Sequence, residues 1–259
     1  MKLTIYQIDA FSSHLFGGNP AAVCPLEEWL ADELMQKIAA ENNLSETAFF
    51  VPRDTGFEIR WFTPTVEVSL CGHATLAAAF VLFHELAYQG KEITFYSQSG
   101  VLNTYLDEGF IVLDFPSSLP IACATPQPIQ QAFGQVVETC LSADDYIVVL
   151  GSEHDVLHAK PDLKLLKSLD LRGVIVTAKS NEYDFVSRFF APNCGIDEDP
   201  VTGSSFTQLA PYWAQRLGKI RLSARQISQR GGEVNCELTA DRVKISGKAV
   251  KYLEGVIYL

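Results

Sequence analysis

The sequence contains no run of apolar residues that is long enough to cross a membrane. The longest run, Ala74–Phe83, is followed by His84 and Glu85, so it falls well short of the roughly 20 residues that span a bilayer. The first nine residues alternate between apolar and polar as a strand does, and they lack the apolar core of a signal peptide. These two absences predict a cytoplasmic protein with no membrane partner.

Paired cysteines and an excess of positive charge are also missing. The six cysteines show no CxxC spacing and are most simply free thiols. A net charge of −11 argues against nucleic acid as a partner. The two glycine pairs, at 17–18 and 231–232, lack the pattern of a nucleotide-binding loop. His154 and His158 have zinc-like i, i+4 spacing but no third ligand at a sensible distance. The pattern therefore predicts neither a nucleotide-binding loop nor a zinc site at these positions.

What is present describes a globular chain near the size at which one core divides into two. The chain has 259 residues, of which 47% are apolar and 20% are charged, and single cores stop growing at roughly 250–300 residues. Residues 117–128 are rich in Pro, Ser and Ala and form the predicted linker. We therefore expect an N-terminal domain, 1–117, and a C-terminal domain, 118–259, with the option that the last strand returns to the first domain.

The stretch Glu67–Thr75 places a carboxylate, a thiol and an imidazole within seven residues. Gly72 then begins a run that is apolar on nearly every side, as in a helix buried inside a protein. The start of such a helix favours a negative charge, because unpaired N–H groups and the helix dipole converge there. This pattern predicts a pocket for a small anion with acid–base groups beside it.

Around this stretch the pattern predicts short strands and few helices. Strands are expected at 5–11, 44–51 and 57–62, and several more in 220–259. Helices are expected at about 26–42, 129–139 and 203–217. The mixture indicates an α+β protein.

The two halves repeat the same order of elements and share short strings. Arg60-Trp61-Phe62-Thr63-Pro64 matches Arg188-Phe189-Phe190-Ala191-Pro192, and Gly72 corresponds to Gly203 with three extra loop residues. Chance similarity of two short strings is the alternative, but order and motif agree together. If the halves are duplicated, the helix starts at Gly72 and Gly203 are expected to face one cleft, and domain interfaces are preferred places for ligand pockets.

Six motifs, which recur in one order over residues 9 to about 206, resemble the PhzF-like family. They are Asp9-Ala10-Phe11, Gly18-Asn19-Pro20-Ala21-Ala22-Val23, Asn43-Leu44-Ser45-Glu46-Thr47, Phe62-Thr63-Pro64, Cys71-Gly72-His73-Ala74-Thr75-Leu76 and Glu198-Asp199-Pro200-Val201-Thr202-Gly203-Ser204. The resemblance implies the diaminopimelate-epimerase-like fold. In that fold each of two similar domains has a curved, mostly antiparallel sheet around a central helix, and the active site lies in the cleft between the domains.

The resemblance also implies roles for particular residues. Glu46 would be the catalytic acid/base, and His73 and Asp199 would line the same site. The substrate carboxylate would bind at Gly72, Gly203 and Ser204. The resemblance further implies that no metal or organic cofactor is used and that the protein is a homodimer.

Each of these residues also has a plainer interpretation from pattern alone. Glu46 lies in an otherwise apolar strand and could face solvent. His73 could be a core histidine with satisfied hydrogen bonds. Asp199 and Ser204 could cap the following helix. The family motifs favour the functional roles.

Cys71 distinguishes two reactions that this fold could support. Epimerases of the fold use two thiols, one on each face of the substrate carbon, and Cys71 matches the first. Depending on the alignment, the second position falls on Thr202 or Pro200, and neither has a thiol. Cys71 is then better interpreted as a small buried residue.

The sequence therefore predicts a cofactor-free isomerase that moves a proton on a small carboxylate-bearing substrate with a single Glu as acid/base. An epimerase or racemase using Cys71 with Glu46 is the alternative within the fold. A carboxylate-binding or scaffold protein without catalysis is the alternative from another class.

Overall fold

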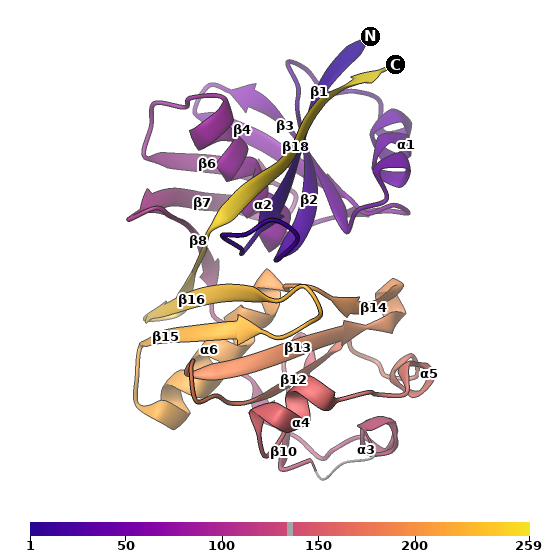
Figure 1. The fold of residues 1–259 in the computed structure, drawn as a ribbon, viewed down its shortest axis with the longest axis vertical. Helices are drawn as coiled ribbons and strands as arrows, with labels where there is room; N and C mark the ends of the chain where they lie inside the picture. The colour runs from indigo at the N-terminus through magenta and orange to yellow at the C-terminus, as the bar shows by residue number, and fades with distance from the viewer. Residues whose placement is uncertain (134–136) are drawn as a thin grey trace. The chain divides into compact units, whose positions relative to one another are not determined.

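The computed structural model describes residues 1–133 and 137–259, and within them the chain forms two compact units. Unit 1 comprises Met1–Asp114 together with Ser246–Leu259, and unit 2 comprises Phe115–Ile245. Both units combine short strands with few helices, as the sequence predicted (Figure 1). No helix among the described residues is long and apolar enough to cross a membrane.

Unit 1 contains a buried central helix and a mixed sheet. Its elements are β1 (Lys2–Ala10), β2 (Asn19–Pro25), α1 (Asp32–Asn42), β3 (Glu46–Arg53), β4 (Gly56–Phe62), β5 (Glu67–Val68), α2 (Gly72–Phe80) with a π-helical turn (Val81–Glu85), β6 (Glu92–Ser97), β7 (Gly100–Asp107), the start of β8 (Phe110–Pro116) and β18 (Ala249–Tyr258). Strand β18 runs antiparallel to β1 over its whole length (Figure 1), so the two ends of the chain lie in the same unit.

Unit 2 has the same kinds of element. They are β9 (Ile121–Ala122), α3 (Gln127–Phe133), β10 (Thr139–Ser142), β11 (Tyr146–Val149), α4 (Glu153–His158), α5 (Leu163–Leu166), β12 (Val174–Lys179), β13 (Phe185–Ala191), a 3₁₀ turn (Pro192–Cys194), β14 (Ile196–Asp199), α6 (Gly203–Leu217), β15 (Arg221–Gln226), β16 (Gly232–Thr239) and β17 (Arg242–Gly247). Helix α6 packs on β15 and β16.

Two predicted helices differ from the observed ones at their boundaries. The helix expected from residue 26 begins at Asp32. The apolar residues before it, Trp29 and Leu30, lie in a segment without regular secondary structure and pack against the hydrophobic cluster beneath α1. The helix expected over 129–139 is α3, which ends at Phe133. Residues 134–136 of that prediction lie outside the described residues, and Thr139 begins strand β10 instead.

The pairing of strands repeats between the units. In unit 1, β2 is parallel to β3, β3 and β5 are antiparallel to β4, and β6 is parallel to β4. In unit 2, β11 is parallel to β12, β12 and β14 are antiparallel to β13, and β15 is parallel to β13. Helices α2 and α6 follow the fourth strand of each series. The duplication inferred from sequence is therefore present in the topology.

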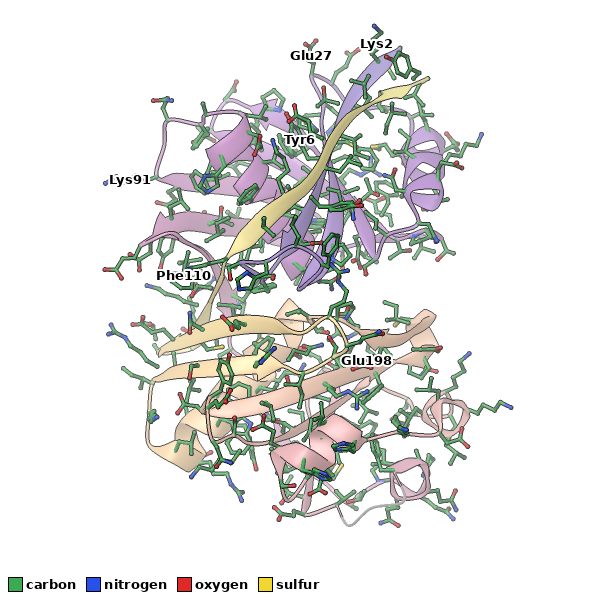
Figure 2. The ribbon with its side chains drawn as sticks, in the orientation of Figure 1. Lys2, Tyr6, Glu27, Lys91, Phe110 and Glu198 are labelled. Carbon is green, nitrogen blue, oxygen red and sulfur yellow. The ribbon has the colours of Figure 1, made fainter. Side chains whose placement is uncertain are left out.

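The repeat extends to side chains. Arg60 forms a bidentate ion pair with Glu67, with both N···O distances at 2.7 Å, and its guanidinium lies 5.1 Å from the Phe62 ring. Arg188 pairs in the same way with Glu198, at 2.7 and 2.8 Å (Glu198 is labelled in Figure 2). Planar bidentate pairs of this kind fix geometry as well as charge. Each pair joins the two strands that precede a central helix.

Strand β3 is covered on both faces, which explains where Glu46 points. Phe49 and Val51 belong to the core beneath α1. Side chains alternate along a strand, so Glu46 and Ala48 point to the opposite face of the sheet. Helix α2 packs on β2 and β3 and is buried at every residue from Gly72 to Ala79. Glu46 therefore points away from α1, and it is 9% exposed.

Candidate active site

Glu46, Cys71 and His73 form one buried cluster in unit 1. Nε2 of His73 lies 3.1 Å from Oε2 of Glu46, and Nδ1 of His73 lies 3.5 Å from Sγ of Cys71. The imidazole is 4% exposed and the thiol 7%. The structure thus brings together three of the residues predicted from sequence, and the interpretation of Glu46 as solvent-facing is wrong.

The contact between Glu46 and His73 is close but poorly aligned. Oε2 of Glu46 and Nε2 of His73 are fully buried, and neither makes a hydrogen bond to any described residue. Buried polar atoms are nearly always hydrogen-bonded in folded proteins, so an unsatisfied pair needs an explanation. A site that binds a polar ligand at these two atoms supplies one.

Asn19 and Ser45 hold the other side of the imidazole. The amide of Asn19 lies with Nδ2 3.2 Å from Nδ1 of His73, and Ser45 donates a hydrogen bond of 3.2 Å from Oγ to Oδ1 of Asn19. When the ring is neutral and Asn19 donates, Nδ1 accepts and the ring proton is on Nε2, facing Glu46; in the imidazolium form Nε2 carries a proton as well. This tautomer is assigned from the network of hydrogen bonds.

The local chain explains how Asn19 reaches the site. Gly18, just before β2, has φ +63° and passes so close to strand β1 that an added Cβ would lie 2.1 Å from the carbonyl oxygen of Ala10. Only glycine fits such a position. Asn43 ends α1 with φ 49°, a left-handed value that asparagine tolerates well. These two residues set the starts of β2 and β3, and hence the places of Asn19 and Glu46.

The charges of the cluster are coupled. Burial lowers the pKa of His73, but Cys71 and Glu46 outweigh it and raise this pKa well above its usual value. Burial, and then Glu46, raise the pKa of the Cys71 thiol to about 11, so at neutral pH the thiol is protonated. Glu46 is then the neighbour that favours the imidazolium. The thiol is no nucleophile at neutral pH, because the thiolate is the reactive form.

The donor atoms of Glu46, Cys71 and His73 lie within 4.8 Å of one another, which raises the question of a metal. Thiolate, imidazole and carboxylate are all zinc ligands. However, Cys71 lies at Nδ1 of the ring and Glu46 at Nε2, and one ion can take only one ring nitrogen. The thiol would also have to lose a proton against a pKa of about 11. These rotamers do not form a ready metal site.

Helix α2 begins inside this cluster. Its N-cap is Cys71, whose side chain makes no capping hydrogen bond to a described residue, and its first residues are Gly72 and His73. The first N–H groups of a helix have no partner within the helix. They supply a partial positive charge at the place where Glu46 and His73 meet.

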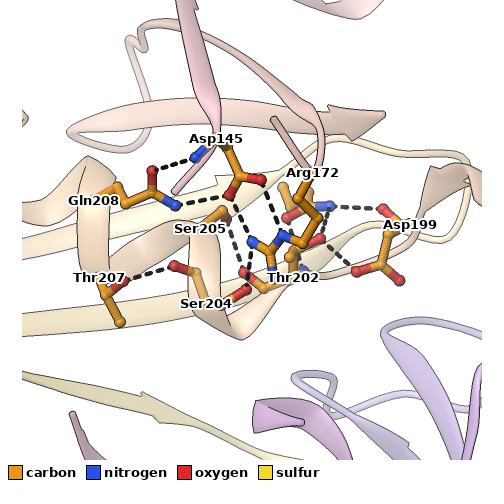
Figure 3. A network of polar contacts seen from close by, with 9 residues as sticks. Asp145, Arg172, Asp199, Thr202, Ser204, Ser205, Thr207 and Gln208 are labelled. Carbon is orange, nitrogen blue, oxygen red and sulfur yellow. Dashed lines mark hydrogen bonds and ion pairs between the residues drawn. The ribbon is translucent and has the colours of Figure 1, made fainter. Parts of the chain in front are cut away.

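Asp199, Gly203 and Ser204 lie together in unit 2, around the start of α6 (Figure 3). The hydroxyl of Thr202 donates to Oδ2 of Asp199. Asp199 therefore contacts the N-cap residue of α6 through its side chain. Thr202 occupies the N-cap of α6 as Cys71 does that of α2. The structural register thus gives unit 2 a threonine at the position that Cys71 occupies in unit 1.

Ser204 belongs to a polar network that the sequence did not predict. Its hydroxyl accepts a hydrogen bond of 3.0 Å from Nη2 of Arg172 (Figure 3). Arg172 also makes a bidentate pair with the fully buried Asp145, at 2.9 and 2.6 Å. Nε2 of Gln208 donates a hydrogen bond of 2.7 Å to the same carboxylate. Arg172 lies between strands in a segment without periodicity, so no local pattern indicated its role.

Asn19 and Ser45 were also missed, although both lie within motifs that carried the family resemblance. Their positions in the sequence are the signal that could have identified them. Asn19 is a polar residue between a glycine and an apolar strand, and Ser45 directly precedes Glu46. Both places predict buried polar contacts once the strand ends are known to meet.

Unit 1 also has a hollow on its surface that is separate from the cluster of Glu46, Cys71 and His73. It has a volume of about 300 Å³ and is lined by Trp29, Arg53, Glu58, Ile59, Arg60, Tyr96, Ser97 and Gln98. Its charges are already paired, Arg53 with Glu58 at 3.5 Å and Arg60 with Glu67. None of the cluster residues lines it.

The chain has an α+β fold of the epimerase-like kind, with two similar units. The family model for phenazine biosynthesis-like proteins matches residues 8–255. The chain belongs to this family. The predicted fold class and the predicted resemblance are both confirmed.

Similar sequences and similar solved structures both agree with this family assignment. An uncharacterized isomerase of Pseudomonas aeruginosa is 53% identical over the full length of both chains. The crystal structure of a PhzF-family protein from Enterococcus faecalis matches with a TM-score of 0.98, 46% identity and complete coverage of both chains.

A more distant structure shares the fold alone. It is a hydroxyproline epimerase from Agrobacterium vitis with trans-4-hydroxy-L-proline bound. Its TM-score is 0.64 at 10% identity, and the match covers 99% of this chain and 92% of that one.

Proposed function

We propose that this protein is an isomerase that moves a proton between two atoms of a small carboxylate-bearing substrate, with Glu46 as the acid/base. The observation that carries the proposal is the buried contact between Glu46 and His73, in which two polar atoms lack hydrogen bonds. A carboxylate in this place can accept a proton from a substrate carbon and return it to another atom on the same face. Such acid–base catalysis contributes about 10²–10⁴-fold in rate.

The other residues of the cluster have supporting roles in this proposal. The proton on Nε2 of His73 faces the position where Glu46 exchanges its proton, so His73 stabilises negative charge that develops there. The first N–H groups of α2 at Gly72 bind the substrate carboxylate. Asp199, Gly203 and Ser204 are retained as catalytic and binding residues on the strength of the family motifs. The reaction requires no metal or organic cofactor.

The rival reaction is epimerisation with Cys71 and Glu46 on opposite faces of a carbon. The threonine at the matching place in unit 2 favours the single-carboxylate reaction. A binding protein without catalysis would keep the pocket but exchange no protons.

The test is proton exchange in deuterated water. A panel of small unsaturated and hydroxylated carboxylic acids is incubated with the enzyme, and deuterium incorporation is followed by NMR. Asp199→Asn tests the second unit in the same assay, and a rate equal to that of wild type would remove Asp199 from the mechanism. Dialysis against EDTA is expected to leave the rate unchanged. Loss of activity that Zn²⁺ restores would overturn the cofactor-free proposal.

A further inference from the structure

Unit 2 holds two thiols in contact, Cys123 and Cys140, which have no part in the proposed reaction. Their sulfur atoms lie 3.7 Å apart. Cys140 is 3% exposed and belongs to the core of unit 2, while Cys123 is partly buried against the same core. Both are reduced here.

The strands bring these residues directly opposite each other. In the antiparallel pairing of β9 and β10, Leu141 faces Ala122 and Ser142 faces Ile121. The next step of that register pairs Cys140 with Cys123, and the N–H of Cys123 donates to the carbonyl oxygen of Cys140 at 3.0 Å. Cα atoms of such hydrogen-bonded pairs lie about 5.5 Å apart, within the range of about 4.4–6.8 Å that a disulfide needs.

We propose that Cys123 and Cys140 form a reversible disulfide when the protein meets a low-molecular-weight disulfide such as oxidised glutathione. The register already gives the separation of the backbones, so only the sulfurs must move, from contact to a bond of about 2.0 Å. The bond fastens β9 to β10.

The chemistry balances as two thiol–disulfide exchanges. Cys123, the more accessible thiol, loses its proton and attacks one sulfur of the reagent. The S–S bond of the reagent breaks, and one small thiol leaves with that proton. Cys140 then loses its proton and attacks the sulfur of Cys123, which releases the second small thiol. Two electrons pass from the two protein thiols to the reagent.

The second exchange is expected to depend on pH. Burial, and then the neighbouring Cys123, raise the pKa of Cys140 to about 12, so very little of it is thiolate at neutral pH. The thiolate fraction, and hence the rate of ring closure, rises about tenfold per pH unit below that value. Mixed disulfide on Cys123 is therefore expected to be longer-lived at low pH.

The experiment treats the folded full-length protein with oxidised glutathione at pH 8. Remaining thiols are alkylated, and the intact mass and the linked peptides are measured. The expected product has lost two hydrogen atoms, four thiols react with the alkylating reagent after unfolding, and one linked peptide joins Cys123 to Cys140. Reduction with dithiothreitol is expected to restore six thiols.

Three variants locate the bond. Cys123→Ser and Cys140→Ser are each expected to abolish the linked peptide, and Cys194→Ser, which removes an exposed lone thiol, is expected to leave it unchanged. If the buried Cys140→Ser variant fails to fold, Cys123→Ser still decides the matter. The proposal is overturned if all six thiols remain, if another pair is linked, or if glutathione stays on Cys123 without ring closure at pH 8 and above. None of these outcomes depends on the proposed isomerase activity.

Discussion

At the scale of single residues, His73 carries a charge that links the site to stability. Its pKa in the folded protein is raised above the value of about 6.5 expected in the unfolded chain. At pH values between these two pKa values, His73 is therefore protonated in the folded state and mostly neutral in the unfolded chain. The stabilisation is complete below about pH 6.5 and is lost as pH rises through the folded pKa, by about 1.4 kcal/mol per pH unit within that window.

The prediction is measured by urea unfolding of wild type and His73→Gln from pH 6 to 9. The stability advantage of wild type is expected to shrink as pH rises, while titrating groups outside the cluster of Glu46, Cys71 and His73 cancel in the difference. An advantage that is constant or grows with pH contradicts the assigned direction.

Asn19 is expected to position His73 rather than to touch the reacting atoms. Asn19→Ala removes the hydrogen-bond partner of Nδ1, so the ring is freer to turn and Nε2 faces Glu46 less often. On the substrate found by the exchange screen, kcat is expected to fall about tenfold with little change in KM, as for an interaction made only in the transition state. Asn103→Ala, on an exposed part of β7, is the control. A rise in KM alone would assign Asn19 to substrate binding instead.

Cys71 separates the two reactions. Cys71→Ser keeps the size of the side chain and removes the thiol, so the single-carboxylate reaction is expected to retain activity within about tenfold, whereas losing an essential acid or base costs about 10²–10⁴-fold. Steady-state kinetics in a Cys194→Ser background excludes effects of the exposed thiol. A loss of a thousandfold would favour epimerisation.

At the scale of elements, the start of β2 depends on a glycine. Gly18→Ala places a Cβ 2.1 Å from the carbonyl oxygen of Ala10 in addition to its φ of +63°. Gly109→Ala has a similar φ of +83° but meets nothing within 4 Å, so it reports the backbone cost alone, about 1–2 kcal/mol. Gly18→Ala is expected to destabilise the protein by more than its control in urea unfolding, and equal losses would contradict the clash.

Periodicity predicted the elements whose burial follows from local pattern. The run after Gly72 is apolar all round and forms the buried helix α2. The aromatic strings at Arg60 and Arg188 predicted the repeat, which the structure shows in strand order and in the two arginine–glutamate pairs. Boundaries were less predictable. Trp29 fits the helical spacing of Leu34 and Ile38 but lies in a segment without regular secondary structure before α1, because tertiary contacts override a weak local preference.

The site was predictable only where a motif named it. Glu46 came from the family resemblance, since an alternating strand pattern alone favoured a solvent-facing glutamate, whereas the pattern around Gly72 had already indicated Cys71 and His73. The pattern could not show that both faces of β3 are covered. Asn19, Ser45 and Arg172 act through contacts between distant parts of the chain. The periodicity of a single sequence does not predict such contacts.

At the scale of the whole molecule, duplication has given two similar units with different chemistry at equivalent places. One helix starts at Cys71 beside Glu46 and His73, and the other starts at Thr202 beside Asp199 and Gln226. The repeat preserves the frame, with its arginine–glutamate pairs, while the side chains at the helix starts have diverged. The proposed function follows this asymmetry, because it assigns the single acid/base, Glu46, to unit 1.

The most direct test of the proposal is Glu46→Gln in the exchange assay, with Glu92→Gln as the matched control, because Glu92 also begins a strand but is exposed. For the carboxylic acid that exchanges with wild type, we expect deuterium incorporation and isomer formation to fall at least a hundredfold in Glu46→Gln and to be unchanged in Glu92→Gln. Folded Glu46→Gln protein that exchanges and isomerises at the wild-type rate would show that Glu46 does not carry the proton.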